Sequence, residues 1–217
     1  MTVHNLDGVR RLAEIGFTRV VLARELSREE IKKICKESPV ELEVFVHGAL
    51  CMCYSGQCEM SAVIGQRSGN RGLCAQPCRM QYSLGGRMDD YPLSLKDNCL
   101  IQHIHKLEEA GVACAKIEGR LKRPEYAAVV SNIYSKVIKE RREPTASEME
   151  QLELAFSRQG FTDGYFTGIK GKEMFGVRRD PGKEQEKFFR SVAKQYIEGE
   201  KQRVPGCCRK KGLSVVG

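Results

Sequence analysis

The sequence predicts an α/β protein in which parallel strands are joined by helices. Two observations support this fold class: strand and helix patterns alternate along the chain, and the apolar strand centres are short. A cysteine-rich insertion at 49–91 interrupts the alternation. Only four strands and a remnant are predicted, whereas a closed eight-stranded barrel typically needs about 250 residues. An incomplete barrel and a complete small α/β domain both fit this count.

Apolar runs and capping residues place each element in order. The predicted strands are a remnant at the start of the chain, then 19–24, 42–48, 92–96 and 114–119. Caps, glycines and prolines bound the helices. We expect the first to begin at Asn5 or Asp7 and to end at Gly16, and the others to lie between Ser27 and Pro39, Asp97 and Gly111, Pro124 and Arg142, and 145 and 158. Crossovers of this kind produce parallel strands.

The pattern loosens after residue 143. We therefore divide the chain into a partial β/α barrel at 1–143, a helix with a Gly and aromatic loop at 144–180, and a poorly defined segment at 181–217. The glycines within RQGFTDGYFTGIKGKEMFG favour a fixed loop or hairpin over a helix. The following FFRSVAKQYIEGEKQRVP fits either a pair of strands or a frayed helix. For the final GCCRKKGLSVVG we predict no element.

The chain of 217 residues is moderately basic, with a formal net charge of +8 and a pI near 9.0. Its positive charge gathers in short runs at 119–123, 139–142, 170–179 and 209–211. Such runs form either an RNA-binding patch or an ordinary solvated surface. No apolar run reaches the roughly 18 residues that a membrane span needs, so we expect a cytoplasmic protein with no membrane partner.

Six of the ten cysteines lie between residues 43 and 99. From Cys51 their spacing is C-x6-C-x15-C-x3-C-x20-C, through Cys58, Cys74, Cys78 and Cys99, with Cys53 as an extra thiol. Thiolates gathered on loops suit zinc or an iron-sulfur cluster. Structural zinc usually shows two cysteine pairs at about x2 to x4 spacing, and within the five-cysteine pattern only Cys74 and Cys78 are so close, which favours the cluster. A disulfide framework would need an oxidising compartment, and the remaining Cys35 and Cys114 read as buried apolar residues.

Several motifs carry a family resemblance over roughly four fifths of the chain. EVFVHGALCMCYSGQCEMS resembles the signature of the collagenase-like peptidase family of unassigned catalytic type, and RSGNRGLCAQPCR, SLKDNCLIQHI and KIEGRLKRPEYAAVV resemble its later blocks. The similarity is greatest to the branch that hydroxylates a cytidine of ribosomal RNA. It implies the later part of a TIM-type barrel whose first strands are absent, and it implies prephenate as a co-substrate.

We expect Cys51, Cys58 and Cys74 to hold a 4Fe-4S cluster, with zinc as the alternative. The resemblance to ubiquinone-hydroxylating members favours Cys99 as the fourth ligand, and Cys78 is the alternative.

Ligands of parallel α/β proteins bind at the carboxyl ends of the strands. Two sets of charged residues follow predicted strands. The predicted catalytic set is His47, Lys116, Glu118 and Arg120, and the predicted substrate-binding set is Arg24, Glu25 and Lys96. His47 could instead close a turn before Gly48, and Asp97 is a helix cap more often than a catalyst. Lys116 and Glu118 should share one strand face, which would be the lumen of a barrel.

Three functions remain open from the sequence. The first is RNA hydroxylation that depends on the thiolate-held cluster and uses prephenate, with Arg120 or Lys116 binding its carboxylates. The second is peptide hydrolysis, although the sequence holds neither HExxH nor GxSxG. The third is an inactive cluster-binding fragment. An incomplete barrel would also leave open sheet edges, through which we expect self-association.

Overall fold

The computed structural model describes residues 2–85, 87–89, 91–119, 122–157, 159–176, 182–198 and 214–216. These ranges form a mixed α/β fold whose main sheet has the order β7-β5-β2-β6-β8, with β1 also paired to β2. The strands of this sheet are β1 (Arg19–Val21), β2 (Glu41–Gly48), β5 (Asp97–Cys99), β6 (Cys114–Ile117), β7 (Phe161–Thr162) and β8 (Ser214–Val216). The α/β class is confirmed, whereas a closed barrel is not seen in these ranges.

Strand β2 is the centre of the sheet. All of its residues after Glu41 are buried, as expected for a strand covered on both faces. β1 pairs with it in parallel from Arg19 opposite Glu41, and β6 pairs in parallel on the other edge from Cys114 opposite Glu43. The parallel strands predicted at 19–24, 42–48 and 114–119 are therefore confirmed, with β1 shorter than expected.

The region from Pro92 to Cys99 differs from the prediction. The strand expected at 92–96 is absent from its place, and β5 forms at Asp97–Cys99 instead, antiparallel to the end of β2. Two hydrogen bonds fix this position: the Asp97 amide donates to the Gly160 carbonyl, and the Asn98 side chain donates to the Phe45 carbonyl. The prediction that Asp97 caps a helix was wrong, because tertiary pairing draws it into the sheet.

The capping signals predicted most of the helices correctly. Asn5 caps α1 (Leu6–Glu14), and Ser27 with Glu30 forms the capping box of α2 (Arg28–Glu37). The remaining long helices are α5 (Pro124–Glu140), α6 (Ala146–Phe156) and α8 (Gly182–Ala193), the last continued by a π-helical turn at Lys194–Glu198. For the segment 188–205, the frayed-helix alternative is therefore confirmed over 188–198, and residues 199–205 lie outside the described residues. None of the described helices has the length and apolarity that crossing a bilayer requires.

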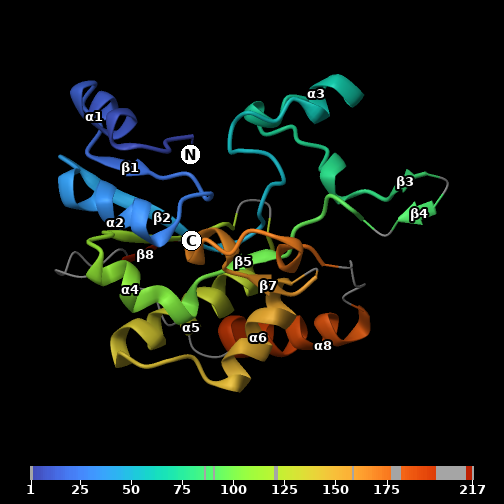
Figure 1. The fold of residues 1–217 in the computed structure, drawn as a ribbon. Helices are drawn as coiled ribbons and strands as arrows, with labels where there is room; N and C mark the ends of the chain where they lie inside the picture. Colours follow the sequence, from blue (N-terminus) through green and yellow to red (C-terminus); the bar gives the residue numbers. More distant parts are fainter. Residues whose placement is uncertain are drawn as a thin grey trace.

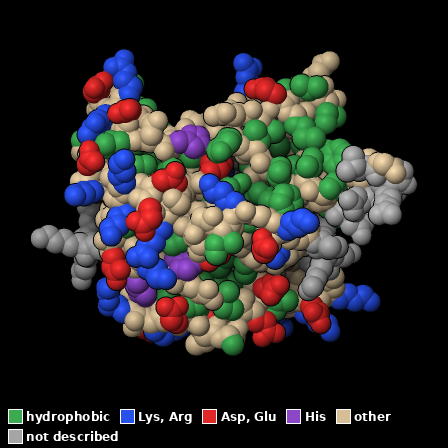
Figure 2. Space-filling model, in the orientation of Figure 1, with side chains coloured by type: hydrophobic (Ala, Val, Ile, Leu, Met, Phe, Trp, Pro, Cys, Tyr) green, Lys and Arg blue, Asp and Glu red, His purple; other side chains and the backbone are tan. Residues whose placement is uncertain are grey.

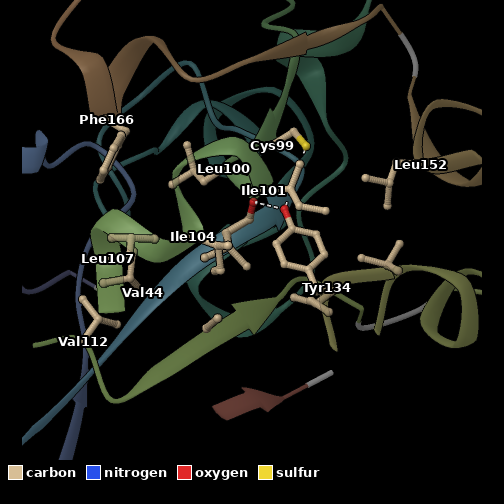
Figure 3. Close-up of a cluster of buried hydrophobic side chains, with 14 of the residues drawn as sticks. Val44, Cys99, Leu100, Ile101, Ile104, Leu107, Val112, Tyr134, Leu152 and Phe166 are labelled. Atoms are coloured by element: carbon tan, nitrogen blue, oxygen red, sulfur yellow. Dashed lines mark hydrogen bonds between the residues drawn. The ribbon is translucent and has the colours of Figure 1, made fainter. Parts of the chain in front are cut away.

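A main core lies between the sheet and helices α4 (Ile104–Glu109) and α5, with the 3-10 turn Ile101–His103 leading into α4. α5, α6 and α8 pack together below the sheet in the view of Figure 1. Tyr134 points from α5 into this core towards Cys99 and Leu100 (Figure 3), and its hydroxyl donates to the Val46 carbonyl at 2.9 Å. The buried phenol thus ties α5 to the central strand.

The cysteine-rich insertion extends away from this body (Figure 1). It contains α3 (Met60–Gly65), 3-10 turns at Gly69–Arg71 and Pro77–Arg79, and a hairpin of β3 (Tyr82–Leu84) with β4 (Arg87–Asp89). Apolar side chains are exposed along it at Met52, Tyr54, Val63, Ile64, Leu73 and Met80. Figure 2 shows hydrophobic side chains gathered on this part of the surface.

The Gly and aromatic segment after α6 is built from short elements, as the glycines predict. It holds β7, α7 (Gly164–Thr167) and a 3-10 turn at Lys172–Met174. A Cβ on Gly164 would lie 2.7 Å from the Ile169 carbonyl oxygen, so the loop closes on itself only with glycine there. The Lys96 amide donates to the Met174 carbonyl, which fixes this loop beside the approach to β5.

Candidate functional site

Two ion pairs lie on the face of β2 and β6 that is turned away from the main core. Lys116 Nζ is 2.6 Å from Glu43 Oε1, and Arg24 Nη2 is 2.6 Å from Glu118 Oε2. The Phe45 ring lies between the pairs, with the Arg24 guanidinium 4.0 Å from its centroid and Lys116 Nζ at 5.6 Å. The expectation that Lys116 and Glu118 share one strand face is consistent with these contacts.

This layer of five residues (Arg24, Glu43, Phe45, Lys116 and Glu118) is largely, but not fully, buried. Arg24 and Glu43 are nearly covered, whereas Lys116 and Glu118 remain partly exposed. Each cation is paired with a carboxylate and lies against the Phe45 ring, so the two positive and two negative charges of the layer balance. The layer is thus a compact group of paired charges at the strand ends, with the Lys116 ammonium and the Glu118 carboxylate as its most exposed members.

Gly48 allows Glu118 to approach β2. Its φ is +123°, and a Cβ added there would lie 2.6 Å from the Cβ of Glu118. Any other residue would be strained at this φ and would push Glu118 away from Arg24. The glycine after His47 therefore has a packing reason at the site.

His47 lies in the core instead of on the ligand-facing side. A register shift in the pairing of β2 with β6 between Phe45 and His47 turns its side chain to the other face. It is 1% exposed, among Tyr126, Tyr134 and Phe161. Burial lowers the pKa of its imidazole to about 3. This position does not favour the catalytic role predicted from the sequence.

Glu25 joins the strand end to the insertion. Its Oε1 accepts hydrogen bonds from both the amide and the hydroxyl of Ser55, each at 2.9 Å. Its Oε2 lies 3.6 Å from His4 Nε2. This carboxylate is buried and binds Ser55, which lies between Cys53 and Cys58 in the insertion. These contacts favour a structural role for Glu25 over the substrate binding that the sequence predicted.

Lys96 and Arg120 complete the predicted charged set. Lys96 is partly buried next to Gly160 and Gly176, where the Gly and aromatic loop covers its side chain. Lys96 thus lies beside β5 and does not join the layer of Arg24, Glu43, Phe45, Lys116 and Glu118. Arg120 lies outside the described residues.

Three thiols of the insertion are close enough to influence one another. Burial raises the pKa of the Cys51 thiol, the Arg24 charge lowers it, and the charges of Cys78 and Cys74 raise it again. Cys51 is exposed as a residue, yet its thiol is surrounded by enough protein for burial to be the largest effect. Arg24 of the ion-pair layer and Cys51 of the insertion are therefore near enough for their charges to interact.

Cys74 lies in surroundings that suit a thiolate ligand. Its sulfur accepts a hydrogen bond from the Gln76 amide at 3.3 Å and from the Ser61 hydroxyl at 3.7 Å. Hydrogen bonds to sulfur tune the potential of thiolate-held iron. Cys53 and Cys58 form a second close pair, and the pKa of Cys53 is raised by burial and then by the Cys58 charge.

Cys99 is buried in the core and apart from these thiols. It pairs with His47 across β2 and β5, and its sulfur is 3.8 Å from the Tyr134 hydroxyl. Burial raises the pKa of its thiol to about 11. These surroundings stabilise a neutral thiol and favour Cys78 over Cys99 as a partner for Cys51.

The thiols do not form a closed site in this conformation. Within the described ranges, no three His, Cys, Asp or Glu side chains converge tightly enough to hold a metal ion. Ligands on irregular loops commonly reach their final positions only when the metal binds. The donor type is the one that zinc and iron-sulfur clusters take in proteins.

Sequence reasoning missed two residues of this region. Tyr165, on α7, lies near Glu25, Cys51 and Cys53. Burial raises the pKa of its phenol most, and the charges of these three residues raise it further. Arg79 is buried within the insertion. The aromatic and glycine pattern marked the segment of Tyr165 as a fixed loop, but no local signal indicates where that loop folds back. For Arg79, the sequence analysis predicted no role.

Comparison with known proteins identifies the relatives of the chain. The model of peptidase family U32 matches residues 1–176. The 23S rRNA 5-hydroxycytidine C2501 synthase of Escherichia coli is 37% identical over 170 residues, which is 76% of this chain and 25% of that protein. No solved structure matches the chain.

Two further relatives differ in what their names state. The tRNA hydroxylation protein P1 of Bacillus subtilis is 36% identical over 195 residues, covering 81% of this chain and 46% of that protein. A collagenase of Porphyromonas gingivalis is 38% identical over 196 residues, covering 77% of this chain and 46% of that protein. The chain thus spans between a quarter and about half of the length of these relatives.

Proposed function

Because the chain belongs to peptidase family U32, we propose that it is the thiolate-bearing part of a protein that hydroxylates a base in ribosomal or transfer RNA. The observation that carries this proposal is that Arg24, whose guanidinium binds Glu118 in the ion-pair layer, is also near enough to Cys51 for its charge to lower the pKa of that thiol. Relatives named for rRNA and tRNA hydroxylation support the choice of RNA as substrate.

The residues that would hold an iron-sulfur cluster are Cys51, Cys58 and Cys74, with Cys78 as the fourth ligand in preference to Cys99. Soft thiolates on loops fit this group, and the donors to the Cys74 sulfur fit its thiolate form. When bound, such a cluster supplies one-electron redox chemistry. The chain itself keeps the ligands beside a partly buried cation, Arg24, which favours the charged thiolate of Cys51.

The ion-pair layer is the proposed site for a carboxylate-bearing co-substrate such as prephenate. An incoming carboxylate would accept a hydrogen bond from Lys116, whose side chain is 33% exposed, or from Arg24, alongside the Glu43 and Glu118 carboxylates that these cations already bind. The Phe45 ring is 3% exposed and packs against both cations, so it supports their positions from within the layer. Removal of one such charge-assisted hydrogen bond should weaken binding by roughly ten- to a hundredfold.

Peptide hydrolysis is the second candidate, because a relative is named collagenase. It would need an activated nucleophile, and the sequence places His47 four residues before Cys51. The structure separates these two roles, since His47 is enclosed by aromatic rings in the core while Cys51 is exposed on the insertion. The thiols therefore fit metal ligation better than a Cys-His dyad.

Anaerobic reconstitution of the purified chain with iron and sulfide tests the cluster. We expect a brown protein with broad visible absorption, whereas a colourless protein holding stoichiometric zinc would overturn the cluster. Mass spectrometry of ribosomal and transfer RNA from cells that lack the parent gene tests the reaction. Loss of a hydroxylated base, restored by the wild-type gene but not by Cys58→Ala, is expected. Unchanged RNA together with iron-independent protease activity would establish the peptidase instead.

A further inference from the structure

Arg79 is a buried arginine within the mostly exposed stretch 71–80. It is 8% exposed, although residues Arg71 to Gln76 before it and Met80 after it are exposed. It ends the 3-10 turn Pro77–Arg79, whose preceding residue Gln76 has a positive φ of 57°. A guanidinium is rarely buried without partners, so the chain must bring acceptors to it from elsewhere.

Those acceptors come from the body of the protein. Arg79 Nη2 donates to the Leu50 carbonyl at 2.7 Å, and Nη1 donates to the Ser94 hydroxyl at 2.8 Å and also to the Leu95 carbonyl. The carboxylate of Asp97, which is 0% exposed, lies 3.9 Å from Nη2 and balances the charge. One side chain thus joins the end of β2, the approach to β5 and the insertion.

The positions of these contacts in the chain have a chemical consequence. Leu50 directly precedes Cys51, and Cys78 directly precedes Arg79. The bond from Nη2 to the Leu50 carbonyl therefore joins the two chain positions next to these thiols, although they are 29 residues apart. Loop closure of this kind is entropically costly, so it needs a specific bond to hold it.

We propose that Arg79 is a positioning residue that holds Cys51 and Cys78 beside each other, so that both thiols can bind the same metal group. This inference rests on the proposed function for its metal, but the positioning itself can be measured without any metal. The side chain acts through the backbone next to each thiol and does not touch the ligand.

The planar fork of arginine explains why this residue type is needed. Its two terminal nitrogens bond acceptors from separate segments, Leu50 on one side and Ser94 with Leu95 on the other. A lysine offers one compact ammonium on a flexible stem and cannot reproduce this planar arrangement. Arg79→Lys should therefore keep the charge beside Asp97 but lose the link between the segments.

The test measures cross-linking of Cys51 to Cys78 by dibromobimane in the reduced, metal-free chain, with the linked pair located by peptide mass spectrometry. The variants are Arg79→Lys and Arg79→Ala, and the matched control is Arg71→Ala, an exposed arginine of the same segment. Loss of charge-assisted hydrogen bonds should slow this cross-link by about tenfold or more in both Arg79 variants. Arg71→Ala should behave as the wild type, and circular dichroism checks that each variant is folded.

Chemical rescue separates positioning from general stability. Millimolar guanidinium should restore the Cys51–Cys78 cross-link in Arg79→Ala, whereas equal ammonium should not. A folded Arg79→Lys protein that cross-links at the wild-type rate, or a wild-type protein that forms no such cross-link, would overturn the proposal. If the cross-link depends on Arg79 but the wild-type protein takes up no iron, the iron-sulfur cluster of the proposed function is wrong. The positioning role of Arg79 is then still supported.

Discussion

Arg24 and Glu118 are separated by 94 residues in sequence, yet Arg24 Nη2 lies 2.6 Å from Glu118 Oε2 above the Phe45 ring. The pair joins the end of β1 to the end of β6 across β2. It also places a cation beside Cys51. Its energetic coupling is therefore the first property to measure.

Substitution of either partner should destabilise the fold. Arg24→Gln or Glu118→Gln leaves a largely covered charge without its partner, and we expect a loss of about 1.5–3 kcal/mol in the free energy of unfolding. Urea denaturation of the single and double variants gives the coupling energy. The exposed pair of Arg11 and Glu14 is the control and should show less than about 1 kcal/mol. Equal coupling energies for the Arg24–Glu118 and Arg11–Glu14 pairs would contradict the expectation that burial strengthens the first pair.

His47 should make the protein sensitive to acid. The pKa of its imidazole is about 3 in the folded state and about 6.5 when unfolded, so between these values only the unfolded state takes up the proton. Stability should be unaffected by this group above pH 6.5 and should fall by about 1.4 kcal/mol per pH unit as the pH drops below it. Urea midpoints measured from pH 7.5 to 5 should show this slope.

His47→Gln should reduce the acid slope, because it removes the group that titrates. His105→Gln, on α4, leaves His47 in place and should keep it. An unchanged slope in His47→Gln would mean that the imidazole is accessible to protons in the folded protein, and it would revive a role for His47 as a base.

Local signals predicted the helices well because the information lies within a few residues. Ser27 and Glu30 form the expected capping box, and Asn5 caps α1. The failures depend on distant partners. The strand expected at 92–96 moved to 97–99 because the Gly160 and Phe45 carbonyls bind its residues. Strand β8 was missed because its three residues pair with β6, and the short run alone carries no period.

The same division applies to the candidate site. Strand alternation placed Lys116 and Glu118 on one face, and cysteine spacing identified the insertion. The register shift after Phe45 turned His47 into the core, and this shift depends on pairing with β6. The residues next to Arg79 in the sequence do not indicate that the Leu50 and Leu95 carbonyls accept its hydrogen bonds. Local patterns thus identify candidate residues, while tertiary contacts decide which of them meet.

Exposed apolar residues on α3 should promote self-association. Val63 is 82% exposed and lies beside Ile64 on the protruding insertion. Val63→Lys should weaken concentration-dependent association in sedimentation velocity and change the free energy of unfolding by less than about 0.5 kcal/mol. Gln57→Lys adds the same charge at an exposed polar position and is the control. Equal effects of the two variants would point to net charge, and no effect of either would point to the sheet edges.

The fourth cluster ligand can be identified by comparing Cys78→Ser with Cys99→Ser. Cys78 affects the charge of Cys51, whereas Cys99 is buried beside Tyr134 with a pKa of about 11. Cys99 is enclosed by the core, whereas Cys78 lies on the insertion with Cys51, so anaerobic reconstitution should load Cys99→Ser with nearly the iron and sulfide of the wild type. Cys78→Ser should retain little. Because serine in the core leaves a hydroxyl in an apolar place, Cys99→Ala serves as a second variant. If both Cys99 variants are folded and lose the cluster while Cys78→Ser keeps it, the core thiol must move on binding, and Cys99 is the ligand.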